Sequence, residues 1–110
     1  MRRFALFLCF LTQPAWADDW RILTGAEIQA ALTGKKLQYA EAWQDFRASG
    51  ATLYNAGRDS WGHWAVRDDQ YCSQWPPQAL WACYDVAAKG DQIRFIGDFN
   101  DETDGTFVTE

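Results

Sequence analysis

The sequence lacks long apolar runs. Its longest, Phe4 to Leu11, has eight residues and as a helix would span only about 12 Å, against roughly 30 Å of membrane hydrocarbon. This length disfavours a transmembrane anchor. Two arginines precede the run, and a proline and the sequence Ala15-Trp16-Ala17 follow it. The pattern predicts a Sec-type signal peptide, residues 1–17, cleaved after Ala17, and hence a periplasmic or secreted protein.

Basic residues are also scarce. The chain has 10 Lys and Arg against 15 Asp and Glu, a net charge of −5. Removal of residues 1–17 takes two arginines and no acid, so 8 basic residues face 15 acidic ones and the charge becomes −7. Nucleic acids and anionic membranes are disfavoured as partners, because binding them needs clustered basic residues. Cationic partners are electrostatically favoured, although acidity also serves solubility alone.

Cysteine is rare, and its placement is informative. Of three cysteines, Cys9 lies in the predicted signal peptide, which leaves Cys72 and Cys83. Two cysteines in an exported chain predict a disulfide. Closing a 12-residue loop would stabilise a small domain by about 3 kcal/mol. Structural zinc is the alternative, but two thiols and a single histidine do not supply four ligands.

Catalytic motifs are missing. Neither G-x-G-x-x-G nor G-x-S-x-G occurs, which argues against dinucleotide-dependent reductases and nucleophile-elbow hydrolases. Oxidised cysteines cannot act as nucleophiles. His63 is the one side chain expected to titrate near neutral pH, with Asp59 or Asp69 as a possible partner. We expect no cofactor and no enzymatic activity, and keep a His63-dependent hydrolase or lyase as the alternative.

Aromatic residues, by contrast, are abundant. Six Trp, four Tyr and four Phe remain after residue 17. Because each aromatic side chain buries a large area, a small domain can fill its core with them.

One helix start is distinct. Thr24 and Glu27 have the spacing of a capping box, and Leu23 can contact Ile28 as a hydrophobic staple. Gly34 is suited to end the helix. The apolar positions between them share one face, so we expect a short amphipathic helix that covers apolar surface.

After Gly34, turn residues recur about every ten positions, which predicts antiparallel strands. A two-residue turn at Asp68-Asp69 would place Trp64, Val66 and Tyr71 on the buried face and His63 towards solvent. The predicted fold is a single mainly β domain, with one N-terminal helix on a strongly bent antiparallel sheet or small barrel. The predicted strands are Lys36 to Tyr39, Ala42 to Ala48, Ala51 to Asn55, Gly62 to Arg67, Gln70 to Trp75, Leu80 to Ala87, Gln92 to Gly97 and Gly105 to Val108.

Two segments are candidate sites. Between the cysteines, Trp75, Pro76, Pro77 and Trp81 form a candidate binding loop, rigid and aromatic; the alternative is that both indoles pack beneath the loop. Further on, Asp98, Asn100 and Glu102 have spacing similar to a calcium loop. Positions six and twelve of such a loop are threonines here rather than Gly and Glu, so we expect no metal site.

Six segments spread over most of the chain after residue 17 form a specific pattern. They are Leu23-Thr24-Gly25-Ala26-Glu27-Ile28, Leu32-Thr33-Gly34, Gly62-x-Trp64-x-Val66, Tyr71-Cys72-Ser73-Gln74-Trp75-Pro76-Pro77, Trp81-x-Cys83-Tyr84 and Arg94-Phe95-Ile96-Gly97. With this pattern the chain resembles a family of small exported proteobacterial proteins of unknown function. The resemblance implies a Gram-negative periplasmic or secreted setting and no assigned activity.

These observations predict a non-enzymatic binding module for a protein or small ligand. One specific version of this hypothesis is an inhibitor of an exported enzyme, which rests on analogy with other small disulfide-bonded β-barrels. After signal cleavage we expect no membrane association and no nucleic-acid partner. A structural envelope component is a further alternative.

Overall fold

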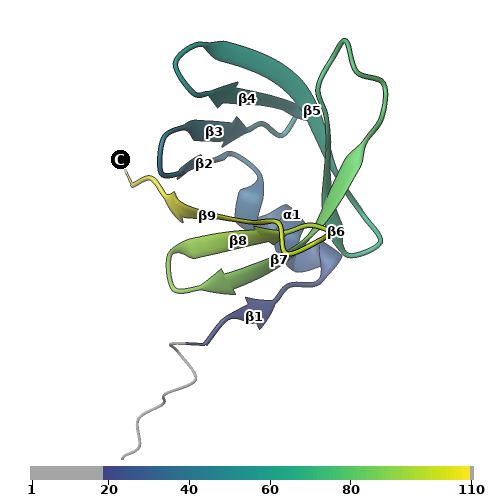
Figure 1. The fold of residues 1–110 in the computed structure, drawn as a ribbon. Coiled ribbons are helices and arrows are strands. Elements are labelled where there is room, and N and C mark those ends of the chain that lie inside the picture. Colours follow the sequence, from purple (N-terminus) through teal and green to yellow (C-terminus); the bar gives the residue numbers. More distant parts are fainter. Residues whose placement is uncertain (1–18, 110) are drawn as a thin grey trace, which may run out of the picture.

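The computed structural model describes residues 19–109, so the predicted signal peptide and its cleavage point lie outside them. Eight antiparallel strands follow one another around a closed barrel, each pairing with its neighbour in sequence (Figure 1). The bounds are β2 Lys35–Gln38, β3 Trp43–Phe46, β4 Ala51–Asn55, β5 Asp59–Arg67, β6 Gln70–Gln74, β7 Ala82–Lys89, β8 Gln92–Ile96 and β9 Glu102–Phe107.

The barrel closes where its last strand, β9, pairs with its first, β2. Leu37 pairs with Phe107 and Gln38 with Thr106, and the backbone N–H of Val108 donates to the carbonyl of Lys36 at 3.0 Å. Closure removes the sheet edges that an open meander would expose. The predicted fold class, a mainly β small barrel with one helix and one disulfide, is confirmed.

Helix α1, Gly25–Leu32, covers one end of this barrel. It begins with the predicted capping box: the Thr24 hydroxyl accepts from the N–H of Glu27, whose carboxylate accepts from the N–H of Thr24. The Asp69 carboxylate, in the β5–β6 turn, accepts from the N–H of Gly25 at 2.6 Å. Ile28 and Leu32 are fully buried, so this end of the barrel is filled. No helix within residues 19–109 has the length and hydrophobicity needed to cross a membrane.

One short strand was not predicted. β1, Arg21–Ile22, pairs with Ala88 and Ala87 of β7. Strand β7 is long enough to change neighbours: its first residues pair with β6 and its later ones with β8 and β1. Two exposed residues carry no strand pattern of their own, so β1 depends on the free flank of β7.

The predicted hairpin at Asp68-Asp69 is confirmed. Both residues have positive φ, 49° and 62°, and Val66 pairs with Tyr71 while Trp64 pairs with Ser73. His63 is exposed on the outer face. Strand β5 begins three residues before the predicted Gly62, because Asp59 pairs with Asn55 across the β4–β5 hairpin.

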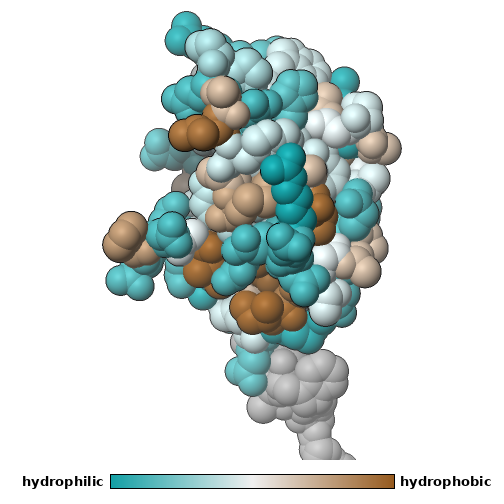
Figure 2. Space-filling view, turned by 90° about the vertical axis from the view of Figure 1, so that its right-hand side faces the viewer, coloured by the Kyte–Doolittle hydropathy of each residue, from teal (hydrophilic) through white to brown (hydrophobic). Residues whose placement is uncertain are grey.

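Aromatic side chains form much of the core, through the buried Phe46, Trp64, Tyr71 and Phe95, while several of the other aromatic residues lie on the outside. The Phe46 ring makes edge contacts with Trp64 and Tyr71 at centroid distances of 5.7 and 5.8 Å. The Trp64 indole N–H donates to the carbonyl of Arg47 at 2.9 Å, so this buried polar group is satisfied. On the outside, the face in Figure 2 is mostly hydrophilic, with separate apolar patches.

Candidate functional site

The barrel is open at the end opposite α1. Four hairpin loops, residues 39–42, 56–58, 75–81 and 97–101, surround this open end, because each links a strand that leaves the α1 end to one that returns. Between them lies a cavity of about 1130 Å³, which reaches the buried residues Gln44, Tyr71 and Ser73. The cavity exists because the inward side chains near α1 fill the barrel completely and those near the loops do not.

The cavity floor is a polar network around the buried amide of Gln44. Its Nε2 donates to the hydroxyls of Thr52 at 2.9 Å and Tyr71 at 3.0 Å, and its Oε1 accepts from the Tyr39 hydroxyl at 2.6 Å. The Thr52 hydroxyl in turn donates to the Asp45 carbonyl at 2.9 Å. These bonds fix the orientation of the amide and satisfy groups that would otherwise be costly to bury.

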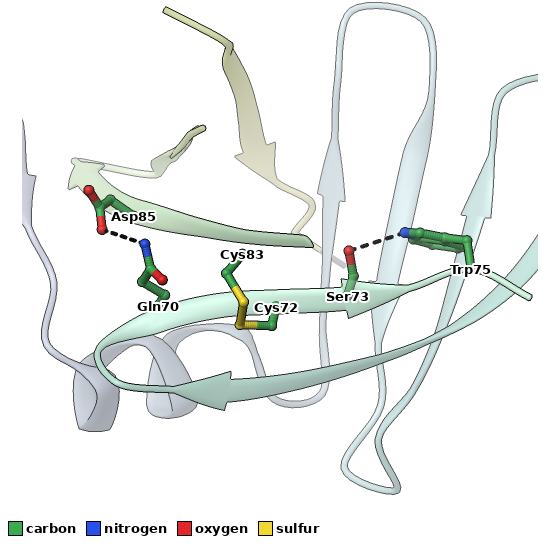
Figure 3. Close-up of a disulfide and its surroundings, with 6 residues drawn as sticks. All are labelled: Gln70, Cys72, Ser73, Trp75, Cys83 and Asp85. Atoms are coloured by element: carbon green, nitrogen blue, oxygen red, sulfur yellow. Dashed lines mark hydrogen bonds between the residues drawn. A yellow bond between two sulfur atoms is a disulfide. The ribbon is translucent and has the colours of Figure 1, made fainter. Parts of the chain in front are cut away.

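Trp75 forms one wall. Its indole N–H donates to the Ser73 hydroxyl at 3.1 Å (Figure 3), and its ring meets Tyr54 edge-on at 6.0 Å. The indole lies against Gly62, where a Cβ would come within 2.5 Å of the ring. The missing side chain at Gly62 therefore allows a tryptophan inside the barrel.

Burial raises the pKa of three tyrosines that line the cavity, Tyr39, Tyr71 and Tyr84. Desolvation raises the pKa of Tyr71 to about 12 and raises the pKa of Tyr39 still further above its ordinary value. Desolvation, with a smaller effect from the Asp101 carboxylate, also raises the pKa of Tyr84. These phenols are thus neutral hydrogen-bonding groups at physiological pH rather than bases.

The cavity mouth is acidic. Four carboxylate residues are among those that line it, and no Lys, Arg or His is. Arg94 binds Asp104 through two hydrogen bonds of 2.8 and 3.0 Å, which lowers the pKa of Asp104, and lies 3.7 Å from Glu102. The other two acids, Glu41 and Asp101, take part in none of the ion pairs among residues 19–109.

The structure separates the residues of the candidate binding loop. Trp75 and Pro76 line the cavity, and Pro77 is exposed. Trp81 lies elsewhere, with the Arg67 guanidinium 4.1 Å above its ring. The disulfide pairs Cys72 with Cys83, directly opposite each other on β6 and β7, beside the Gln70–Asp85 hydrogen bond (Figure 3). It holds together the two strands that carry the loop.

His63 and its proposed acid partners are not brought together. Asp59 is four residues away on the same strand, roughly 13 Å at about 3.3 Å per residue, and its carboxylate accepts from the Asn55 amide at 2.8 Å. Asp69 binds the start of α1. None of these three residues lines the cavity.

The acidic segment after β8 forms the 97–101 loop and the start of β9. Asn100 has a positive φ of 63°, and Glu102 faces Arg94. Over residues 19–109, no three His, Cys, Asp or Glu side chains gather as a metal site would require.

Sequence reasoning missed most of the cavity residues. Tyr39, Gln44 and Tyr54 meet through neighbouring hairpins, but they share a cavity with Tyr84 and Asp101 only when the barrel closes. One signal was present: Gln44 shares its strand face with Phe46, so a polar residue occupies a position that alternation assigns to the interior.

No family model, curated protein or solved structure matches this chain.

Proposed function

We propose that the chain is a non-enzymatic, exported binding protein that holds a small ligand inside the open end of its barrel. The observation that carries this proposal is the cavity itself, about 1130 Å³ in volume and lined by aromatic rings above a fixed polar floor. Ligand sites typically combine such apolar walls with a few placed polar groups. Exported location rests on the sequence prediction and agrees with the disulfide, which persists in oxidising compartments.

Preorganisation supports binding within the barrel. The polar floor and the Trp75 wall are held by hydrogen bonds that need no ligand, so little conformational entropy is lost when a ligand enters. A His63-dependent hydrolase is less well supported, because His63 lies on the outer face, away from the cavity.

The test is to block the cavity. Thr103 pairs with the inward-facing Phe95 and lines the cavity, whereas Thr106, on the same strand, points outward. We expect Thr103→Trp to abolish the fluorescence increase of the neutral probe N-phenyl-1-naphthylamine, and Thr106→Trp to leave it unchanged. Circular dichroism and urea midpoints check that both variants fold. Equal probe binding by the two variants would refute a site inside the barrel.

A second candidate, protein binding, is favoured by two exposed apolar side chains. Leu80 is 86% exposed and Phe99 99% exposed, and both lie on loops around the cavity mouth. Exposed apolar side chains of this kind are suited to contact another protein, such as an exported enzyme. If Thr103→Trp has no effect on a biological activity that the double variant Leu80→Ser, Phe99→Ser abolishes, the loops rather than the cavity carry the function.

A further inference from the structure

We propose that the cavity selects organic cations, small molecules that carry a quaternary or protonated amine on an apolar body. This inference rests on the proposed ligand-binding function and names the chemical class of the ligand. It depends on which rings in the protein already hold a cation, and on the charges around the mouth.

The aromatic lining suits both parts of such a ligand. Aromatic faces attract ammonium groups within about 6 Å of the ring centre and also bury apolar surface. Within the lining, Tyr71 and Phe95 lie 4.9 Å apart and Tyr39 and Tyr54 6.2 Å apart. The aromatic residues that line the cavity are Tyr39, Tyr54, Trp61, Tyr71, Trp75, Tyr84 and Phe95.

Rings on the outer wall already have cations of their own. Lys36 lies 4.4 Å above Trp43, Arg47 lies 4.8 Å above Trp61, and Arg67 and Arg94 lie over Trp81 and Trp20 at 4.1 Å each. Of these rings, Trp61 also lines the cavity, and Lys35 lies 5.9 Å from the ring of Phe107, which packs against the core and does not line the cavity. Among residues 19–109, none of the other six cavity-lining rings, Trp75 included, has such a contact. These six rings are therefore available to a cation that the protein does not itself supply.

The acidic groups at the cavity mouth also favour a cationic ligand. Asp101 lies beside Tyr84: both crowd Gly97, where a Cβ would be 3.0 Å from a carboxylate oxygen of Asp101 and 3.0 Å from the Tyr84 ring. Glu41 adds a second carboxylate in the 39–42 loop. An ammonium group at the Tyr84–Asp101 side would meet a ring and a carboxylate together.

An anionic ligand such as a fatty acid fits poorly. Its carboxylate would enter a cavity lined by acids and by no Lys, Arg or His, so no positive charge would offset the loss of its hydration. The net charge of the chain, −5, acts in the same direction by attracting cations over a longer range.

The experiment compares three probes by competition with N-phenyl-1-naphthylamine. Phenyltrimethylammonium is the cation, tert-butylbenzene its uncharged isostere, and benzoate the anion. We expect the cation to bind at least threefold more tightly than the isostere, from a cation–π contribution of about 0.7 kcal/mol or more, and benzoate not to compete. Added salt should weaken binding of the cation only.

Two variants in one loop provide the matched control. Asp101→Asn and Asp98→Asn each remove one negative charge, but only Asp101 lines the cavity. We expect Asp101→Asn to weaken the binding of phenyltrimethylammonium about two- to fivefold, as for a partly exposed charge pair. Asp98→Asn should change its dissociation constant less than 1.5-fold, a margin of roughly 0.2 kcal/mol. Adding Glu41→Gln to Asp101→Asn should weaken binding of the cation further.

The outcomes separate the two proposals. If N-phenyl-1-naphthylamine binds but the cation is no tighter than its isostere, or both Asp variants behave alike, cation selectivity is refuted and the ligand-binding function stands. If the naphthylamine gives no fluorescence increase and isothermal titration calorimetry detects no binding of the other three probes to the wild-type protein, both proposals fail.

Discussion

Gly62 is the position at which a single methyl group should do most harm. A Cβ there would lie 2.5 Å from Cε3 of Trp75, 2.8 Å from its Cδ2 and 2.7 Å from the backbone carbonyl oxygen of Gln74. None of these atoms is the free end of a flexible chain. Gly62→Ala must therefore move the Trp75 indole, the β6 backbone or both.

Whether Gly62→Ala stabilises or destabilises the protein shows which effect dominates, strand propensity or side-chain packing. Glycine inside a strand is less stable than alanine by roughly 0.5–1 kcal/mol, so strand propensity alone predicts a stabilised variant. Overpacking of a filled interior typically costs about 1–3 kcal/mol, and here a carbonyl is among the contacts. We expect a net loss of about 2 kcal/mol. With a urea m-value of roughly 1.5 kcal/mol/M, the unfolding midpoint should fall by about 1.3 M.

Urea unfolding followed by far-UV circular dichroism measures this loss without interference from the other tryptophans. A second pair of variants asks what Gly62 accommodates. If the indole is the main obstacle, Gly62→Ala should cost less in a Trp75→Ala background, with a coupling energy of about 1 kcal/mol. An unchanged or raised midpoint for Gly62→Ala would refute the reasoning, and equal costs in both backgrounds would assign the clash to the carbonyl alone.

Three further predictions concern stability. Replacing Cys72 and Cys83 together by Ser should lower the free energy of unfolding by about 3 kcal/mol, measured in urea against the oxidised wild type, and a loss below 1 kcal/mol would contradict the loop-closure argument. Thr24→Ala should cost about 1 kcal/mol by removing the capping box, while Thr24→Ser should cost little. Because the pKa of Tyr71 is raised to about 12 in the folded protein from about 10 unfolded, its contribution is complete below pH 10 and is lost between pH 10 and 12. Tyr71→Phe should therefore reduce the alkaline slope of unfolding free energy by roughly 1.4 kcal/mol per pH unit, and an unchanged slope would show that another group titrates.

Much of the local structure could be predicted because its causes are local. The capping box at Thr24 and Glu27 involves neighbours in sequence, and the turn at Asp68-Asp69 fixes the register of the strands on either side. Because strand side chains alternate between faces, that register alone places Trp64, Val66 and Tyr71 inside. The disulfide followed from counting the two cysteines left after the predicted signal peptide.

The cavity could not be predicted in this way. The sequence allows Trp75 either to bind from an exposed loop or to pack beneath that loop together with Trp81. In the structure Trp75 lies inside the barrel mouth, while Trp81 lies under Arg67. That difference depends on Gly62, thirteen residues earlier and on the neighbouring strand. The sequence around a glycine does not indicate which distant side chain will occupy the space that the glycine leaves.

The helix, the eight barrel strands in their order and the inward face of β5 and β6 can be inferred from the amino-acid sequence alone, since they follow from turn chemistry and from the twofold alternation of a strand. Where the barrel is filled and where it is hollow depends on contacts between residues far apart in the sequence. Packing depends on which side chains meet across the interior: Tyr39 reaches Gln44 within the β2–β3 hairpin, but Gln44 on β3 meets Tyr71 on β6 only because the sheet curls into a barrel.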